Sequence, residues 1–223
     1  MAERQLPLAF PHTPRFTEAS FLPGRGNQLA LDFLANTRTW PRGQLALWGA
    51  RGSGKTHLLH IWARNHGAEV MDGTRLGRPI WPESALAVDD IDQIQSEPAL
   101  LHLINAAAEA GQKLLLASTT APGRLPVRLP DLASRLRAMA AVGIGDADDA
   151  FLAALLERQL SERQLRVGVA VRAWILTQIP RTPAAIEEVA ARLDHVALAA
   201  GSAVTRQVAA RALAGLTEDA APA

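Results

Sequence analysis

The segment from Gly49 to Thr56, GARGSGKT, has the spacing G-x-x-x-x-G-K-T of a phosphate-binding loop. Its glycines let the backbone wrap so that successive N–H groups face one phosphate, and Lys55 adds a point charge for the β and γ phosphates. The loop lies between an apolar run at 44–48 and a stretch with helical apolar spacing, whose N-terminal partial positive charge favours an anion. We predict that a nucleotide binds here, through Gly49, Ala50, Arg51, Gly52, Ser53, Gly54, Lys55, Thr56 and the adjoining His57.

Further along the chain, the apolar run Leu86–Val88 ends in two carboxylates, Asp89 and Asp90. We predict that Asp89 and the hydroxyl of Thr56 hold a magnesium ion. We predict that Asp90 orients or polarises the attacking water. The alternative is a solvated acidic turn, DDID, after a core strand, but the presence of the phosphate loop favours the functional interpretation.

The remaining pattern indicates an α/β base followed by a helical unit. Short apolar runs predict strands at 44–48, 69–72, 85–89, 114–118 and 139–144. Helices are predicted between them at 56–65, 97–110 and 132–136, and another after a turn at 21–27, with Leu29, Leu31, Phe33 and Leu34 on or near its apolar side. Strands that alternate with helices indicate a parallel sheet covered on both faces. From about Asp146 onward the pattern predicts only helices, at 151–164, 169–178, 183–200 and 205–216.

These patterns divide the chain into four parts. We predict a flexible N-terminal tail at 1–20, an α/β nucleotide-binding base at 21–145, a helical lid at 146–217 and a disordered tail at 218–223.

The composition excludes several classes of protein. Of the 223 residues, 48% are apolar, which is enough for a sizeable core, and the absence of cysteine excludes disulfides, thiolate zinc sites and iron–sulfur clusters. The 23 basic and 22 acidic residues give a formal charge of +1, so net charge does not favour nucleic acid or an acidic membrane. The N-terminus has no signal-peptide pattern, and no apolar run reaches about 18 residues. We therefore expect a soluble cytoplasmic protein without a membrane partner.

Three segments resemble the AAA+ ATPases of the DnaA initiator group: GKTHLL at 54–59, VDDI at 88–91 and DLASRL at 131–136. The resemblance extends over about residues 20–216. It implies an AAA+ base with a five-stranded parallel sheet, a small all-helical lid, and bound ADP or ATP with magnesium. The chain departs from the group's pattern at 137–139, where Gly-Trp-Gly or Asp-Trp-Gly is absent, and at 72–84, which is too short for the usual helix.

The same resemblance implies roles for four polar residues. Arg135 would be the arginine finger that reaches out of its own subunit into a neighbour's nucleotide site, and the alternative is an ordinary surface arginine. Arg181 would be the lid arginine that senses the γ phosphate. Ser118 and Thr119, at the end of the fourth predicted strand, would lie where the group has a polar sensor.

The N-terminal hexapeptide QLPLAF is similar to the Q-L-x-L-x-F peptides that dock on the sliding clamp of the replicative polymerase. Its contact residues would be Gln5, Leu6, Leu8 and Phe10, since apolar anchors on an extended peptide can enter a preformed pocket. The alternative is an N-terminal strand or a tail that packs on its own domain.

Within the DnaA group these features resemble the Hda branch, the regulatory inactivators of DnaA, which carry such a peptide. The resemblance implies a regulator of replication initiation that is tethered to the clamp and inserts Arg135 to trigger hydrolysis of DnaA-bound ATP. The predicted partners are DnaA, the sliding clamp and a second copy of the chain. We expect no helix-turn-helix domain after the lid, and therefore no sequence-specific DNA binding. The alternatives are an ATPase of the helicase-loader type that acts on single-stranded DNA, and a stand-alone P-loop ATPase.

Overall fold

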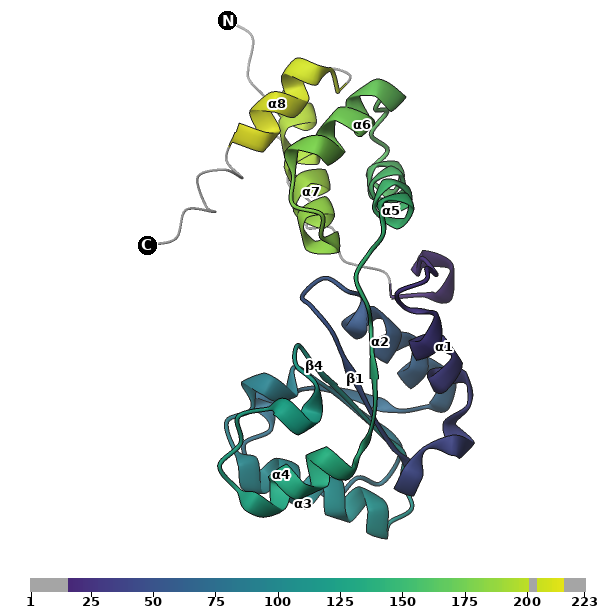
Figure 1. Cartoon of the computed structure of the whole chain (residues 1–223), viewed down its shortest axis with the longest axis vertical. Helices are drawn as coiled ribbons and strands as arrows, with labels where there is room; N and C mark the ends of the chain where they lie inside the picture. The colour runs from purple at the N-terminus through teal and green to yellow at the C-terminus, as the bar shows by residue number, and fades with distance from the viewer. Residues whose placement is uncertain (1–15, 201–203, 215–223) are drawn as a thin grey trace, which may run out of the picture. The chain divides into compact units, whose positions relative to one another are not determined.

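The structure is a computed structural model that describes residues 16–200 and 204–214 (Figure 1). Two compact units make up the chain, the first ending at Asp146 and the second beginning at Ala147. The predicted clamp peptide, Gln5–Phe10, and the predicted tail at 218–223 lie outside the described residues. None of the helices in the described ranges is long and apolar enough to cross a bilayer.

A five-stranded parallel sheet forms the centre of the first unit, which confirms the predicted fold class. Its strands are β1 (Gln44–Trp48), β2 (Glu69–Asp72), β3 (Leu86–Asp89), β4 (Leu114–Ser118) and β5 (Ala140–Gly143), in the order β2-β3-β4-β1-β5. All pairings are parallel, and β1 pairs with β4 from Gln44↔Leu114 to Trp48↔Ser118. Each predicted strand agrees with the observed one within one residue at either end. Because the strands are parallel, the segments that follow β1, β3 and β4 emerge at one edge of the sheet.

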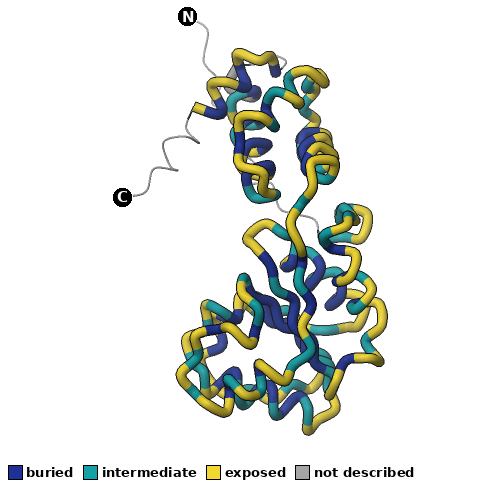
Figure 2. Tube along the Cα trace, in the orientation of Figure 1, coloured by how far each residue is buried: buried dark blue, intermediate teal, exposed yellow. Residues whose placement is uncertain are grey.

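Helices cover both faces of this sheet. The helices α1 (Gln28–Ala35) and α2 (Lys55–His66) pack on one face, and α3 (Glu97–Glu109) and α4 (Pro130–Ala138) pack on the other. The first face presents Leu45, Leu47, Ala87, Leu115 and Ala117. The second face presents Ala46, Leu86, Val88, Leu114 and Leu116. Since successive side chains of a strand point to opposite faces, burial on both faces explains the unbroken apolar runs of the central strands (Figure 2).

Short 3-10 turns connect these elements. They are η1 (Glu18–Ser20), η2 (Thr37–Thr39), η3 (Pro41–Gly43), η4 (Gly73–Arg75), η5 (Ile91–Gln93) and η6 (Pro122–Arg124). The first of them lies within the predicted N-terminal tail, so the described end of that tail contains a 3-10 turn. Thr17 caps η1 by accepting a hydrogen bond from the N–H of Ser20 at 3.1 Å.

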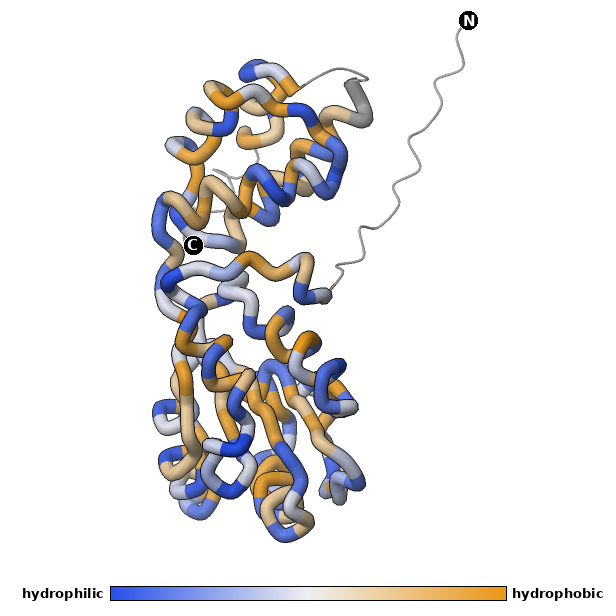
Figure 3. The backbone as a smooth tube through the Cα atoms, turned by 90° about the vertical axis from the view of Figure 1, so that its right-hand side faces the viewer, coloured by the Kyte–Doolittle hydropathy of each residue, from blue (hydrophilic) through white to orange (hydrophobic). Residues whose placement is uncertain are grey.

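The second unit is helical, as predicted from the loss of strand signals. Its described helices are α5 (Asp149–Glu162), α6 (Val169–Gln178), α7 (Pro183–Ala200) and α8 (Arg206–Ala214). Their apolar sides enclose a separate core that includes Leu152, Leu156, Leu160, Ile186, Val189, Leu193, Val208 and Ala212. Apolar residues accordingly recur at intervals along these helices (Figure 3). An isolated parallel bridge between Val167 and Val204 is a detail that the sequence pattern did not predict.

The prediction for α1 is wrong at one position. The side chain of Leu29 is 57% exposed, whereas Ala30 and Leu34 are buried. Residues 30 and 34 are four apart and therefore share one face of the helix, while Leu29 is turned away from that face. Leu31 and Phe33 are partly buried beside it.

This difference within one helix can be measured. Leu34→Ala should lower the free energy of unfolding by about 2–5 kcal/mol, because it removes buried methyl groups from the core. Leu29→Ala should change it by less than about 0.5 kcal/mol, because the leucine is mostly exposed. Urea denaturation of both variants compares the two values, and equal losses would contradict the orientation of α1.

Candidate nucleotide-binding site

The predicted phosphate loop connects the end of β1 to the start of α2, as its spacing requires. Gly52 and Gly54 have φ angles of 74° and 94°, in the left-handed region that favours glycine. The N–H of Gly49 donates to the carbonyl of Ser118 at 3.2 Å, which fixes the start of the loop against the end of β4. The loop thus has the strand, glycine turn and helix that a phosphate-binding backbone needs.

Lys55 is the first residue of α2 and is buried, with 6% of its surface exposed. Its ammonium donates to the carbonyls of Gly49 at 2.8 Å and Ala50 at 2.9 Å, which holds the side chain back over the loop. An ammonium has three N–H donors, so these two bonds are compatible with a third to a phosphate oxygen. Burial lowers the pKa of Lys55, and the negative charges of nearby aspartates counteract that shift.

Thr56 and Asp89 are joined directly. The Thr56 hydroxyl donates to a carboxylate oxygen of Asp89 at 2.6 Å, which links the first turn of α2 to the end of β3. The other oxygen of Asp89 accepts the N–H of Asp90 at 2.9 Å. A hydroxyl and a carboxylate side by side are oxygen ligands of the kind that Mg²⁺ uses together with phosphate oxygens. Within the described residues, no cluster of three or more His, Asp or Glu side chains could hold a metal by itself, so a magnesium ion here would depend on the nucleotide.

Asp90 lies in a left-handed turn, with φ 49° and ψ 47°, at the end of β3. Gly73 packs against this turn, since a Cβ there would lie 2.7 Å from the carbonyl oxygens of both Asp89 and Asp90. Partial burial raises the pKa of the largely exposed Asp90 carboxyl, and the negative charges of Asp89 and Asp92 raise it further. A carboxylate with a raised pKa is a better proton acceptor, which suits the predicted role in polarising water.

Asp92 joins the end of β3 to the end of β4, a contact that the sequence pattern did not predict. One of its carboxylate oxygens accepts hydrogen bonds from the N–H of Thr119 at 3.3 Å and from the Thr119 hydroxyl. Its other oxygen is buried without a hydrogen-bond partner. Ser118, the other predicted sensor, is fully buried, and its hydroxyl donates to the carbonyl of Thr120 at 2.6 Å. Only the third carboxylate of the run DDID could have indicated this bridge.

The same edge of the sheet therefore brings together the loop, Asp89, Asp90, Ser118 and Thr119. His57 follows the loop, but its ring nitrogen Nε2 lies 2.9 Å from the carbonyl oxygen of Thr17 and 3.2 Å from the hydroxyl oxygen of Ser20. Its described partners are thus in the N-terminal segment, and its contact with a nucleotide stays a prediction.

Arg135 lies at the opposite edge of the sheet from the loop. It is in the last turn of α4, which leads into the start of β5, and Ala140 in β5 is paired with Leu45 near the start of β1. The loop follows the end of β1, so about 13 Å of strand separates the loop from the level of Leu45 and Ala140. Leu132 and Leu136 are buried and anchor α4 on α3 and the sheet, while Arg135 is half-buried between them. The last turn of α4 therefore leads to the amino edge of the sheet, whereas the loop follows the carboxyl edge.

Arg181 belongs to the second unit. It precedes α7, and its guanidinium forms an ion pair with the carboxylate of Asp149 in the first turn of α5. Both side chains are mostly exposed. Arg181 therefore binds an anionic group within its own unit, and its contact with a γ phosphate stays a prediction.

Solved structures share this fold. Domain III of the replication initiation protein DnaA from Thermotoga maritima matches with a TM-score of 0.77 over 92% of this chain and 98% of that chain, at 17% identity. DnaA from Aquifex aeolicus bound to AMPPCP matches with a TM-score of 0.63 over 79% of this chain and 64% of that chain, at 20% identity. The RuvB Holliday junction branch migration motor of T. maritima matches with a TM-score of 0.64 over 86% of this chain and 70% of that chain, at 20% identity.

No model of a known protein family matches the sequence. The structural likenesses establish the AAA+ fold that DnaA and RuvB share. The chain spans nearly all of DnaA domain III but less than two thirds of the A. aeolicus DnaA chain.

The raised pKa of Asp90 predicts a pH-dependent stability. Between the ordinary carboxyl value of 3.8 and the raised value, the folded state holds a proton that the unfolded state releases, so stability falls as pH rises through this window. Asp90→Asn should therefore stabilise the nucleotide-free, magnesium-free protein at pH 7, by less than about 1 kcal/mol because the group is largely exposed.

The gain should disappear below the ordinary carboxyl pKa, where Asp90 is protonated in both states. Urea midpoints of the wild type and the variant at pH 7 and below pH 3.8 make the comparison. A gain that is equal at both pH values would instead indicate that asparagine suits the left-handed backbone better, and would contradict the electrostatic explanation.

Proposed function

We propose that this protein is a nucleotide-bound AAA+ regulator of replication initiation, of the Hda type, which stimulates hydrolysis of ATP bound to DnaA. The observation that carries the proposal is the position of Arg135 at one edge of the sheet and of the phosphate loop at the other. A domain with this arrangement can stack on a similar domain so that its arginine meets the neighbour's nucleotide. The match to 98% of DnaA domain III supports DnaA as the neighbour.

The protein's own nucleotide would be ADP or ATP with magnesium. The loop N–H groups and Lys55 would hold the phosphates, and Thr56 and Asp89 would hold the magnesium ion. The bound nucleotide would supply a dense negative charge, and Arg181, which is paired with Asp149 in this structure, would be the residue that senses its γ phosphate. In this proposal the chain's own nucleotide orders its structure, and the hydrolysis that matters occurs on DnaA.

Arg135 would act on the nucleotide of DnaA in trans. Its guanidinium is always charged and presents several N–H donors in a fixed plane, so it can stabilise the charge that develops on a transferring phosphoryl group. Such a finger is worth about 10³ to 10⁵ in rate.

Glu97 anchors the start of the helix that carries this finger. Its carboxylate accepts the N–H groups of Arg128 at 2.9 Å and Leu129 at 2.7 Å, the two residues just before α4. These hydrogen bonds lower the pKa of Glu97. The anchor limits the freedom of α4 and so supports a finger in a defined position.

The N-terminal hexapeptide Gln5–Phe10 would tether the protein to the sliding clamp. Its support is the similarity of QLPLAF to clamp-binding peptides and its location before the folded base. An extended peptide with apolar anchors gains affinity from a few deep contacts, so a short segment can suffice. Tethering would confine the activity to clamps loaded on DNA.

The finger can be tested by two substitutions on one helix. Arg135→Ala should abolish stimulation of DnaA's ATPase, a loss of at least about 10³-fold, while ADP binding by the variant remains unchanged. Arg137→Ala, on the exposed side of the same helix, is the matched control and should retain activity. Single-turnover hydrolysis of ATP bound to DnaA measures the stimulation by each variant. Retained stimulation by Arg135→Ala would contradict the assignment of Arg135 as the finger.

The tether can be tested separately by removing residues 5–10. Binding to the purified sliding clamp should be lost in this deletion, whereas thermal stability and ADP binding should not change. No clamp binding by the full-length protein would contradict the tether. If the full-length protein also hydrolysed ATP rapidly alone and bound single-stranded DNA, a helicase-loader type of function would replace the proposal.

A further inference from the structure

The first described residues of the chain, Phe16–Phe21, lie against the helix that follows the phosphate loop. We call this segment the clasp. It joins the base to residues 1–15, which include the hexapeptide of the proposed tether. A hydrogen bond at 2.8 Å from Thr17 to Ser20 through their hydroxyl groups, in a capping box around η1, gives the clasp a defined shape.

Two histidines of α2 hold the clasp. The ring of Phe16 stacks on the ring of His60, with centroids 4.4 Å apart and planes 4° from parallel. The same phenylalanine meets the ring of His57 edge-on at 5.4 Å, and Phe21 meets it edge-on at 5.3 Å. His57 also lies within hydrogen-bonding distance of the Thr17 carbonyl. Aromatic pairs of this geometry stabilise the folded state by more than the burial of their apolar area alone contributes.

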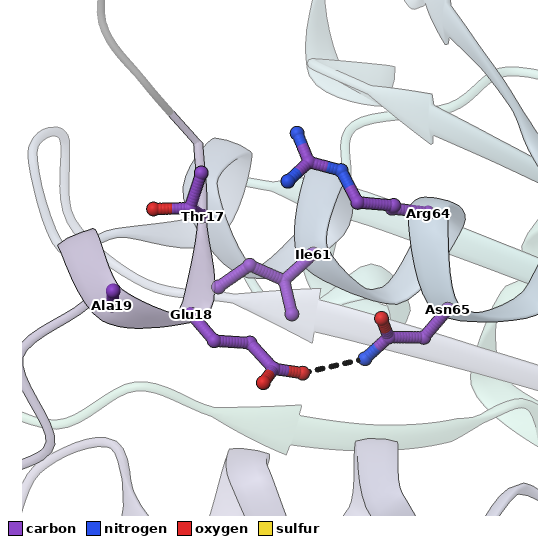
Figure 4. A pocket seen from close by; sticks show the side chains of 6 residues that line it. All are labelled: Thr17, Glu18, Ala19, Ile61, Arg64 and Asn65. Atoms are coloured by element: carbon purple, nitrogen blue, oxygen red, sulfur yellow. Dashed lines mark hydrogen bonds between the residues drawn. The ribbon is translucent and has the colours of Figure 1, made fainter.

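The clasp extends along α2 from the loop toward the far end of the helix. At the loop end, the ring of Phe21 is so close to Gly54 that a Cβ there would lie 3.2 Å from it. At the far end, Asn65 donates to the carboxylate of Glu18 at 2.8 Å. Figure 4 shows this bond beside a shallow pocket of about 310 Å³ between η1 and α2, which Ile61 and Arg64 also line.

We propose that the clasp couples nucleotide occupancy of the phosphate loop to the attachment of the N-terminal tail. The proposal rests on the proposed function, since it needs a nucleotide in the loop and a partner on the tail. Phe21 touches the loop at Gly54, and His57 immediately follows Thr56, the proposed magnesium ligand. A bound nucleotide orders these residues and so strengthens the clasp.

The coupling must act in both directions. If nucleotide favours the closed clasp by some factor, then a partner that pulls the clasp open must weaken nucleotide binding by the same factor. Only five residues lie between Phe10 and Phe16, so the two Cα atoms are at most about 20–22 Å apart even when the chain is fully extended. A partner that holds the hexapeptide is therefore close enough to strain the clasp.

The test measures ADP affinity and the opening of the clasp in the same full-length proteins. Phe16→Ala should weaken ADP binding by about fivefold or more, the lower end of typical coupling between sites. Phe33→Ala removes a partly buried phenylalanine of α1 that takes no part in the ring pairs of Phe16 and Phe21 with His57 and His60, and it should leave ADP affinity unchanged. His60→Ala should weaken ADP binding by about as much as Phe16→Ala. The double variant should lose little more ADP affinity than either single variant, because each single substitution already removes the same stacked pair.

Amide hydrogen exchange of the wild type provides a second readout that does not depend on a variant. Addition of ADP should slow exchange at residues 17–21, which close on α2, and Phe16→Ala should remove that protection. Two results would overturn the coupling but leave the nucleotide site intact. In the first, Phe16→Ala binds ADP with the same affinity as the wild type. In the second, the wild type binds ADP but exchange at residues 17–21 does not slow. Failure of the wild type to bind ADP or ATP at all would overturn the proposed function, and the coupling with it.

Discussion

The hydrogen bond from the Thr56 hydroxyl to the Asp89 carboxylate, 2.6 Å long, is the interaction on which the rest of the site depends. It fixes the first turn of α2 at the end of β3, and the buried Lys55 next to Thr56 is thereby held over the loop carbonyls. The same helix then carries His57 and His60, which hold the clasp. A change at this bond would therefore affect the phosphate loop, the proposed magnesium ligands and the N-terminal segment together.

The parallel sheet separates two chemical tasks in space. Polar residues after β1, β3 and β4 meet at the carboxyl edge, because parallel strands all end on the same side. Arg135 lies at the amino edge, in the helix that leads into β5, and Glu97 fixes the start of that helix. One domain can thus receive a nucleotide at one edge and present a cation at the other, which is the arrangement required for action on a neighbouring domain.

Much of this architecture could be predicted from the sequence, because it depends on signals that repeat or are unusually specific. The three central strands are short apolar runs buried on both faces, and the loop is an eight-residue pattern between a strand and a helix. The contacts that were missed depend on single side chains in irregular segments: Asp92 with Thr119, and Phe16 with His60. Nothing periodic marks such pairs, since they form only when distant segments fold together. Leu29 was misplaced because one turn of helix offers two neighbouring apolar faces, and only packing selects between them.

The most direct test of the account is calorimetric titration of the full-length protein with ADP, in the presence and absence of magnesium, for the wild type and Thr56→Val. Valine matches the shape of threonine but removes the hydroxyl that donates to Asp89 and would ligate the metal. We predict that magnesium strengthens ADP binding to the wild type by at least about tenfold, equivalent to about 1.4 kcal/mol, and that Thr56→Val loses this gain. No ADP binding by the wild type, or an equal magnesium effect in both proteins, would contradict the assignment of this edge as a nucleotide and magnesium site.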